Sequence, residues 1–379
     1  MVQLSVIILN YNVKHFLKLC LQSVVEATKN IPAEIIVADN ASKDGSMHMV
    51  AQDFPDIIRL ENKENLGFSK ANNLAVKQAK GKYVCILNPD TVVPEDIFSE
   101  LLAFIKTVPD FGAVGVKLID GKGQFLPESK RQIPTPKVAF QKMVGEASNY
   151  YANYLEPNSI GKVDVLVGAF MFMSRQRYLQ VEGFDEDYFM YGEDIDLSYK
   201  LLKAGYKNYY FGKESVIHFK GESTVKDEVY RARFYGAMQL FYKKHFSNSK
   251  LTNLIVKAAL KVAKRVHKIQ GAQTEKESST SVFIYLGNSS NCVSILSKLK
   301  NKQVQHLSLE ELNKLTLKNT QLFLDTQFFS YKEIISFLEL FGHHNNTFRI
   351  KLKSSNVLIG SDTSTGRGEV LVLELDEIQ

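Results

Sequence analysis

Asp90 is a residue whose setting suggests chemistry. It lies in the segment LNPDT, directly after a wholly apolar stretch, and Pro89 stiffens the chain at that point. A divalent ion such as Mg²⁺ or Mn²⁺ is commonly held by one or two carboxylates and completed by phosphate oxygens, so Asp90 is a candidate metal ligand for a bound diphosphate. Asn-Pro-Asp is also a favourable turn sequence, and the pattern leaves both interpretations open.

A second group of acidic residues lies in GFDEDYFMYGEDIDL, where Glu193, Asp194 and Asp196 open a predicted helix that ends near Gly205. Acids in a first helical turn are expected from capping and from the helix dipole, and Asp196 with Lys200 forms an ordinary i,i+4 pair. Three acids exceed that need. A carboxylate that lies among others in a cleft can have its pKa raised and can act as a general base.

Four further residues have both a structural and a functional interpretation. His218 ends a short predicted strand in VIHFKGEST and is either a structural histidine or a metal ligand. Asp39, in DNASKDGS, either caps the next helix or accepts a hydrogen bond from a pyrimidine ring N–H. Gly168 interrupts an apolar predicted strand and Gly67 precedes a predicted helix, which indicates close approach of the backbone to a ligand or simply a turn.

Alternating strands and helices must position these residues. Strands are predicted over Leu4–Leu9, Glu34–Asp39, IIRLEN and Lys82–Asn88, and helices over His15–Ala27 and Phe68–Lys80, with one more helix after Asp39. Strands separated by single helices form parallel βαβ units with both sheet faces covered. Ligands of such sheets bind off the carboxyl ends of the strands, which is where Asn10, Tyr11, Asp39 and Asp90 fall.

The composition is that of an ordinary globular protein and excludes several classes. Of the 379 residues, 45% are hydrophobic and 23% are charged. No apolar run approaches the ~20 residues of a membrane span, and the first residues lack the charged region and cleavage site of a signal peptide. We therefore expect a cytoplasmic protein that is neither exported nor integral to a membrane. Three isolated cysteines, Cys20, Cys85 and Cys292, offer neither a disulfide framework nor a zinc cluster.

The net charge of +6 comes from one short segment. Residues 1–270 carry 36 Lys and Arg against 29 Asp and Glu, and Lys250–Lys268 alone holds six bases and no acid. Because the remaining charge is nearly balanced, a nucleic-acid-binding surface is not expected. The segment is a predicted amphipathic helix, which either packs on the preceding domain or lies on an anionic membrane surface, at the inner face of the cell membrane.

The chemical motifs together resemble a known family. VIILNYN, ADNAS, ENLGFSKANN, LNPDT, GAFMFMSR, GFDEDYFMYGEDIDL and HFKGEST, in this order and at these intervals, are similar to the family 2 inverting glycosyltransferases of the GT-A fold, especially the rhamnosyltransferase-like branch. The resemblance covers about residues 1–245. It implies an α/β fold with a mainly parallel sheet flanked by helices. It also implies metal-dependent transfer of a sugar from a nucleotide diphosphate sugar, with inversion at the anomeric carbon.

The resemblance assigns roles by position. It implies that Asp39 holds the nucleotide base, that Asp90 is the metal-binding acid of the DxD element, and that Asp194 deprotonates the acceptor hydroxyl. His218 corresponds to a histidine that joins the metal, Mg²⁺ or Mn²⁺, in some members. Asn88 stands where the fuller DxD element has Asp, and this departure weakens the case for tight metal binding.

Other positions would line the substrates. By the same resemblance Asn10 and Tyr11 line the nucleotide pocket, while Gly67 and Gly168 let the chain pass close to donor and acceptor. Glu193 and Asp196 belong to the acceptor side or support it. The family label favours dTDP-rhamnose as donor, with UDP-sugars next, and a glycan or lipid-linked glycan as acceptor in cell-surface polysaccharide synthesis.

Rival classes fit less well. A dinucleotide oxidoreductase or a nucleotidyltransferase needs a glycine-rich phosphate loop near the first strand, but that strand is followed by NYNVKHF. A catalytically weak sugar-nucleotide-binding or scaffolding protein of a glycan assembly complex is the alternative. Such a protein would have no reason to keep Asp90, Asp194 and His218 together.

We divide the chain into a glycosyltransferase domain over 1–248, a basic amphipathic helix over 249–270, a polar linker over 271–280 and a small α/β accessory domain over 281–379. In the last part VFIYLG, QLFLDT and VLVLEL are predicted strands, and Cys292–Leu299 and Tyr331–Phe341 are predicted helices. Because no catalytic set is found there, we expect a module separable from donor chemistry, so that a chain ending near Gln270 still folds. The pattern does not specify an oligomeric state.

Overall fold

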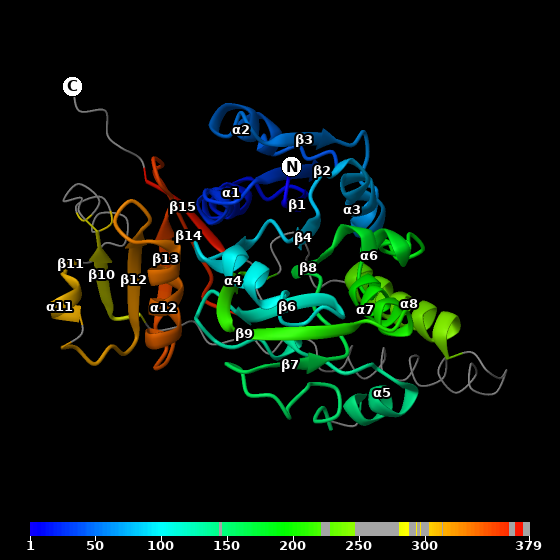
Figure 1. Ribbon diagram of the computed structural model, residues 1–379. Helices are drawn as coiled ribbons and strands as arrows, with labels where there is room; N and C mark the ends of the chain where they lie inside the picture. The colour runs from blue at the N-terminus through cyan, green and yellow to red at the C-terminus, as the bar shows by residue number, and fades with distance from the viewer. Residues whose placement is uncertain are drawn as a thin grey trace.

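Two β-sheets organise the chain, and Figure 1 shows them next to each other. The computed structural model describes residues 1–143, 146–220, 228–246, 280–287, 293, 296, 303–312, 314–363 and 368–373. The basic segment Lys250–Lys268, most of the linker and Cys292 lie outside these residues, so what we predict for them stays a prediction. Among the described residues, no helix combines the length and the apolar character needed to cross a bilayer.

The first sheet has nine strands in the order β3-β2-β1-β4-β8-β6-β9-β5, with β7 paired to β9. Its strands are β1 (Leu4–Asn10), β2 (Ala33–Asp39), β3 (Ile58–Glu61), β4 (Tyr83–Leu87), β5 (Thr91–Val92), β6 (Phe111–Ile119), β7 (Ile160–Val163), β8 (Phe170–Ser174) and β9 (Lys207–His218). The helices of this part are α1 (Lys14–Thr28), α2 (Ser46–Asp53), α3 (Gly67–Gln78), α4 (Ile97–Phe104), α5 (Pro136–Met143), α6 (Arg175–Gln180), α7 (Glu193–Lys203) and α8 (Glu228–His245), with a short 3₁₀ turn at Pro127–Ser129.

The parallel βαβ units predicted from the sequence are confirmed. β1 pairs in parallel with β2 and β4, and β2 pairs in parallel with β3. The register places Asn10 opposite Asp39, so their side chains meet at the carboxyl edge of the sheet. Leu17 and Cys20 of α1 cover one face of the sheet, and Val76 of α3 belongs to the core on the other face. The predicted α/β class is therefore confirmed.

The expectation that Gly168 interrupts a strand is wrong. β7 ends at Val163, and the chain re-enters the sheet only at Phe170 as β8. Between them, the backbone of Val165 pairs with that of Arg131, which draws this stretch out of the sheet. β9, which ends at His218, has 12 residues and is longer than the short strand expected there.

The second sheet confirms an α/β arrangement for the C-terminal part. Its strands are β10 (Val282–Leu286), β11 (Val304–His306), β12 (Thr320–Asp325), β13 (Thr347–Lys351), β14 (Val357–Gly360) and β15 (Glu369–Val372), in the order β11-β10-β12-β13-β14-β15. The first four are parallel in this order, and the last two pairings are antiparallel. Two described helices belong to this part, α11 (Leu309–Leu312) and α12 (Tyr331–Phe341).

The two sheets share one apolar core. Phe16 and Leu19 of α1 and Ile217 of β9 belong to the same buried cluster as Ile334 and Leu338 of α12. In Figure 1, α12 lies between the second sheet and the strands of the first. The division of the chain at residues 271–280 stays a prediction, but the packing shows that the described parts on either side of it are in close apolar contact.

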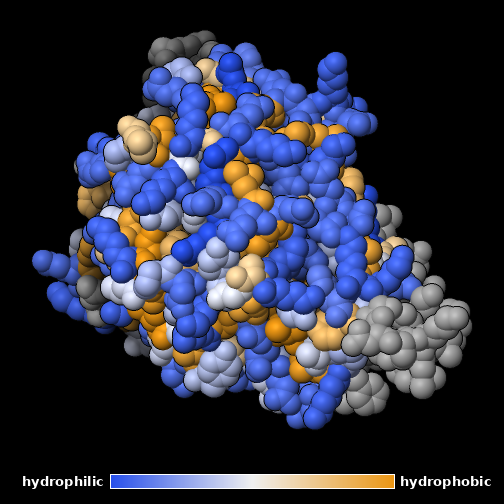
Figure 2. Space-filling view, turned by 45° about the vertical axis from the view of Figure 1, so that its right-hand side comes forward, coloured by the Kyte–Doolittle hydropathy of each residue, from blue (hydrophilic) through white to orange (hydrophobic). Residues whose placement is uncertain are grey.

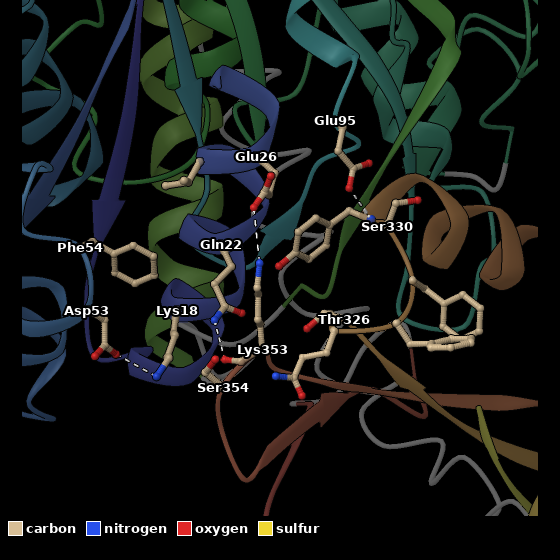
Figure 3. Close-up of a pocket in the computed structure, with 15 residues that line it drawn as sticks. Lys18, Gln22, Glu26, Asp53, Phe54, Glu95, Thr326, Ser330, Lys353 and Ser354 are labelled. Atoms are coloured by element: carbon tan, nitrogen blue, oxygen red, sulfur yellow. Dashed lines mark hydrogen bonds and ion pairs between the residues drawn. The ribbon is translucent and has the colours of Figure 1, made fainter. Parts of the chain in front are cut away.

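Polar contacts join the same two parts around a cavity of 610 Å³, shown in Figure 3. Gln22 of α1 donates to the carbonyl oxygen of Lys353 at 3.0 Å. Glu95 accepts hydrogen bonds from the backbone N–H groups of Tyr331 and Lys332 at 2.7 and 2.9 Å. A carboxylate at a helix N-terminus is favourable because it meets unpaired N–H groups and the positive end of the helix dipole.

Hydrophilic side chains cover most of the face shown in Figure 2, and apolar side chains appear there only in small separate groups. Most of the large apolar side chains of the described residues are buried against the faces of the two sheets, as expected for a globular chain.

Candidate active site

A cavity of 310 Å³ opens at the carboxyl edge of the first sheet. Asp90 lines it from the turn directly before β5, His218 lines it from the end of β9, and Glu193 and Asp194 line it from the first turn of α7. Tyr11, Gly67 and Gly168, also predicted from the sequence, line the same cavity. The structure therefore brings most of the predicted site residues together, although they come from distant parts of the chain.

The larger cavity between the two sheets is a poorer candidate for chemistry. None of the predicted site residues lines it. Four of its charged side chains are paired, Lys18 with Asp53 at 2.8 Å and Lys353 with Glu26 at 3.7 Å, and Glu95 accepts hydrogen bonds from two backbone N–H groups. We therefore place the active site in the smaller cavity, which most of the predicted site residues line.

Asp90 and His218 are neighbours because a short antiparallel pairing brings β5 onto β9. Thr91 lies opposite His218 in this register, and Asp90 directly precedes it. His218 Nε2 lies 3.4 Å from Asp90 Oδ1 and 3.4 Å from the side-chain nitrogen of Asn88. Both Asp90 and His218 are buried. The pair forms one wall of the cavity.

This pair fits a divalent ion bound together with phosphate oxygens. Among the described residues, no three His, Cys, Asp or Glu side chains gather into a complete metal site. Mg²⁺ and Mn²⁺ do not need such a cage, because the phosphate oxygens of the ligand and water fill the other positions. His218 Nδ1 is buried and has no hydrogen-bond partner among the described residues, so the imidazole is not committed to a structural network. Asn88 adds an amide beside the pair instead of a second carboxylate.

Asp194 is held by three donors. Its Oδ2 accepts from Arg131 Nη2 at 2.7 Å and from the N–H of Gly168 at 3.1 Å, and its Oδ1 accepts from the N–H of Ile195 at 2.8 Å. A Cβ atom at Gly168 would lie 3.4 Å from the Cβ of Asp194, which is a close but ordinary contact. Gly168 thus serves the site through its backbone N–H.

Glu193 lies beside Asp194 and differs from it electrostatically. It is 6% exposed, and its Oε2 has no hydrogen-bond partner among the described residues. Burial, and then the neighbouring charge of Asp194, raise the pKa of Glu193 to about 8. At neutral pH this carboxyl is therefore mostly protonated, which is consistent with an acid held in an apolar pocket.

Arg131 is the site residue that the sequence motifs do not reveal. It lies in the segment after the 3₁₀ turn, far in sequence from each of those motifs, and its side chain is 8% exposed. Burial by itself lowers the pKa of the Arg131 guanidinium, but Asp194 and Tyr150 outweigh this effect and the net shift is upward. A single arginine in a polar loop carries no pattern in one sequence, and only the folded structure shows it against Asp194.

Asn10 and Asp39 do not line the cavity directly. Asn10 donates from its side chain to Asp39 Oδ1 at 2.7 Å and to the Ser42 hydroxyl at 3.1 Å, and Asp39 Oδ2 accepts from the N–H of Ser42 at 2.8 Å. Asp39 therefore shapes the turn after β2. It does not cap α2, whose N-cap is Gly45. Tyr11, 38% exposed, lines the cavity next to this turn.

Gly67 allows a close approach between two loops. Its φ is +79°, and a Cβ atom there would lie 2.5 Å from the carbonyl oxygen of Phe189. The next residue, Phe68, donates its N–H to that same oxygen at 2.7 Å. Only glycine is unstrained in this conformation with this contact. Gly67 thus joins the start of α3 to the loop that precedes α7.

Asp196 lies behind the site and also does not line the cavity. His245 Nε2 lies 2.6 Å from its Oδ1, the hydroxyl of Tyr188 donates to it at 3.5 Å, and Lys200 Nζ lies 3.7 Å from its Oδ2. His245 is the last residue of α8, so Asp196 anchors that helix. Phe234 and Met238 of α8 line the cavity. Because Asp196 holds this helix in place, it supports the site without lining it.

Comparison with known proteins shows what this chain is similar to. Residues 5–180 match the family model for glycosyl transferase family 2. The chain is 29% identical over 242 residues to the N-acetylglucosaminyl-diphospho-decaprenol L-rhamnosyltransferase of Mycobacterium tuberculosis, covering 59% of this chain and 78% of the relative. It is 29% identical over 170 residues to rhamnosyltransferase WbbL of Escherichia coli K12, covering 40% and 61%.

Among solved structures, the mannosyltransferase PcManGT from Pyrobaculum calidifontis, determined with GDP-Man and Mn²⁺, aligns with a TM-score of 0.46 and 19% identity over 71% of this chain and 76% of that one. The match of residues 5–180 confirms the family expected from the sequence motifs for this part of the chain, which carries a family 2 glycosyltransferase domain.

Proposed function

We propose that this glycosyltransferase moves a sugar from a nucleotide diphosphate sugar to a hydroxyl group of a glycan or lipid-linked glycan, with inversion at the anomeric carbon. One observation carries the proposal: Asp194 and the Asp90–His218 pair line the same cavity, although Asp90 and Asp194 come from opposite halves of the domain. Direct displacement needs these two functions on opposite sides of the sugar, a base for the acceptor and a stabilised leaving diphosphate.

Asp194 takes the proton of the acceptor hydroxyl in this scheme. Its two oxygens are oriented by the N–H groups of Gly168 and Ile195 and by Arg131, so the carboxylate needs no rearrangement before it acts. Asp90 and His218 would hold Mg²⁺ or Mn²⁺, which when bound offsets the charge of the leaving diphosphate. No enzyme nucleophile is required.

The nucleotide lies, in this proposal, along the turns after β1 and β2. Asp39 is fixed there by Asn10 and Ser42, yet each of its oxygens accepts only one of these hydrogen bonds and has a lone pair left for a pyrimidine N–H. This arrangement suits the thymine of dTDP-rhamnose or the uracil of a UDP-sugar.

The relatives support the choice of substrate. The names of the mycobacterial and E. coli proteins specify rhamnosyl transfer, and the mycobacterial name specifies a diphosphate-linked lipid acceptor that carries N-acetylglucosamine. We propose rhamnose from dTDP-rhamnose as the first donor to test, a lipid-linked acceptor, and a role in cell-surface polysaccharide synthesis. A cytoplasmic enzyme at the inner face of the membrane would meet both substrates, and Lys250–Lys268 would supply the contact with anionic lipid.

The test is a screen of dTDP-rhamnose, UDP-glucose, UDP-N-acetylglucosamine and GDP-mannose by thermal stabilisation and by hydrolysis, each with Mn²⁺, Mg²⁺ or EDTA. A ligand that binds only the folded chain raises its stability by about 2.7 kcal/mol at about 100 times its Kd. We expect one thymidine or uridine donor to stabilise and to be hydrolysed only with metal. Metal-independent binding of every donor, with no hydrolysis, would favour the scaffolding alternative.

A further inference from the structure

The contact between Arg131 and Asp194 is built more rigidly than an ordinary surface ion pair. Arg131 Nη2 donates both to Asp194 Oδ2 at 2.7 Å and to the carbonyl oxygen of Leu166 at 2.5 Å. The side chains of Arg131 and Asp194 are only 8% and 12% exposed. A buried ion pair is costly unless its geometry is good. Here Nη2 makes both hydrogen bonds, while Arg131 Nε is buried and has no hydrogen-bond partner among the described residues.

The backbone of Arg131 is fixed as well. Its N–H donates to the carbonyl of Val165 at 3.1 Å, and the N–H of Val165 donates back at 3.0 Å. The hydroxyl of Tyr150 also hydrogen-bonds the guanidinium. Arg131 thus reaches Asp194 from a segment whose position is set by the loop between β7 and β8, the same loop that presents Gly168.

The hydrogen bonds decide which oxygen of Asp194 is available. A carboxylate oxygen has two lone pairs. Oδ2 already accepts from Arg131 and Gly168, whereas Oδ1 accepts only from Ile195. The remaining lone pair on Oδ1 is therefore the place for an incoming proton.

We infer that Arg131 is a positioning residue for the proposed base: it fixes Asp194 so that Oδ1 takes the proton, and it makes Asp194, not Glu193, the ionised carboxyl of the adjacent pair. The inference rests on the proposed function. Two adjacent buried carboxyls cannot both ionise easily, and a cation in contact with one of them selects that one. Arg131 contacts Asp194, while Glu193 Oε2 has no partner among the described residues.

The remaining charges near the pair are matched elsewhere. Asp196 pairs with Lys200 and His245 and accepts a hydrogen bond from Tyr188. Lys220 pairs with Glu128, and Asp90 lies beside His218. In the described part of the chain, Arg131 is thus the cation that directly contacts this pair of carboxyls, and it does so at Asp194. Its removal would leave Asp194 and Glu193 competing for one proton.

Two substitutions test this inference in the full-length chain. Arg131→Met removes the charge with little change in volume, and Arg131→Lys keeps a charge but loses the planar guanidinium whose Nη2 reaches both Leu166 and Asp194. The matched control is Arg175→Met, because Arg175 also donates to two carbonyls, those of Val76 and Lys77, but contacts no part of this site. The readouts are donor Kd, kcat, and kcat/KM as a function of pH at saturating metal.

We expect Arg131→Met to keep the donor Kd within about twofold, to lower kcat on the order of 10²-fold, and to move the acidic limb of the kcat/KM profile upward by about one pH unit or more. Arg131→Lys should recover part of kcat and keep the wild-type acidic limb. Arg175→Met should have the same pH profile of kcat/KM as the wild type. An acidic limb that does not move in Arg131→Met contradicts the inference.

If Arg131→Met does not fold, two variants that keep Arg131 test the inference instead. Glu193→Gln resembles the protonated carboxyl that the inference assigns to Glu193, so it should lose far less activity than Asp194→Asn and keep the wild-type acidic limb. A greater loss in Glu193→Gln than in Asp194→Asn would overturn the assignment. A wild-type chain without any donor turnover would instead contradict the proposed function itself, and the inference with it.

Discussion

At the scale of residues, the site consists of acids whose neighbours give them different properties. Asp194 is held by two backbone N–H groups and by Arg131, while the adjacent Glu193 is buried without a partner for Oε2 among the described residues. Asp90 faces His218. In the function that we propose, carboxyl side chains in one cavity therefore serve as a base, a neutral acid and a metal ligand.

The metal assignment makes a direct prediction. Asp90→Ala should abolish the difference in donor affinity between Mn²⁺ and EDTA, because the carboxylate is the charged ligand of the pair. His218→Ala should reduce that difference less. Isothermal titration with the best donor measures it. Donor affinity that still depends on metal in Asp90→Ala would show that the ion is held elsewhere.

Glu193 predicts a pH dependence of stability. Its pKa in the folded chain is raised to about 8 from an ordinary value of 4.5. Between these values the folded chain holds a proton that the unfolded chain has lost, so the free energy of unfolding should fall as the pH rises through this window. Urea unfolding at about pH 5.5 and about pH 8.5 measures the change.

Glu193→Gln should remove much of that difference, because glutamine does not titrate. The exposed Glu310→Gln is the control and should keep the wild-type difference. Equal slopes of stability against pH in wild type and Glu193→Gln would mean that Glu193 is ionised in the folded chain.

The residue scale also shows the limit of the sequence. Asp90, Asp194 and His218 can be found because each follows a recognisable strand end or opens a helix. Arg131 cannot, because its role depends on the pairing of its backbone with Val165 across the fold. The sequence pattern singles out Asp39 and Asp196 as polar residues of the site, but neither of them lines the cavity.

At the scale of elements, loops decide the shape of the site more than strands do. The apolar patterns of β1, α1 and β2 predict their boundaries to within one or two residues. α12 is predicted over the same residues that it occupies, and a capping box of Ser330 and Glu333 fixes its start. The prediction for the stretch around Gly168 is wrong, because its apolar residues pack as a loop paired to Arg131 and not as a strand.

A substitution at Gly67 tests whether loop contacts hold the shape of the site. Gly67→Ala should destabilise the chain for two reasons, a positive φ of +79° and a contact of 2.5 Å between the new Cβ and Phe189 O. Gly205→Ala is the matched control, since Gly205 has a φ of +88° but no atom within 4 Å of the place that a Cβ would take. The control should therefore cost only the conformational part, about 1–2 kcal/mol.

We expect Gly67→Ala to lower the free energy of unfolding by more than Gly205→Ala and to weaken donor binding, since Gly67 lines the cavity. Urea unfolding and donor titration measure both effects. Equal losses of stability in the two variants would show that the contact with Phe189 relaxes freely and that the loop is not held there.

At the scale of the whole molecule, the two sheets form one packed body. Removal of residues after Gln270 would expose Phe16, Leu19 and Ile217, which are buried against α12 and the second sheet. The polar linker suggests a separable module, but this apolar contact changes our expectation. We now predict that a chain ending near Gln270 is less stable than the full chain or aggregates, as measured by thermal unfolding and gel filtration.

A pair of substitutions on α12 tests the same point without truncation. Ile334 is fully buried in the shared core, and Leu340 on the same helix is 65% exposed. Ile334→Ala should destabilise the chain by about 2–5 kcal/mol and lower the temperature at which donor binding is lost, whereas Leu340→Ala should change neither. Donor binding that survives the unfolding of the C-terminal part would support two independent units instead.

The central claim is that Asp194 is the base of an inverting sugar transfer in the cavity formed with Asp90 and His218. The most direct measurement is turnover with the donor found by the screen, in wild type, Asp194→Asn and the exposed control Asp56→Asn, with the anomeric configuration of the product read by NMR. We predict a product inverted relative to the donor, wild-type turnover in Asp56→Asn, and turnover roughly 10²–10⁴ times lower in Asp194→Asn with donor affinity unchanged. Near wild-type turnover in Asp194→Asn, or a product that retains the donor configuration, would contradict the account.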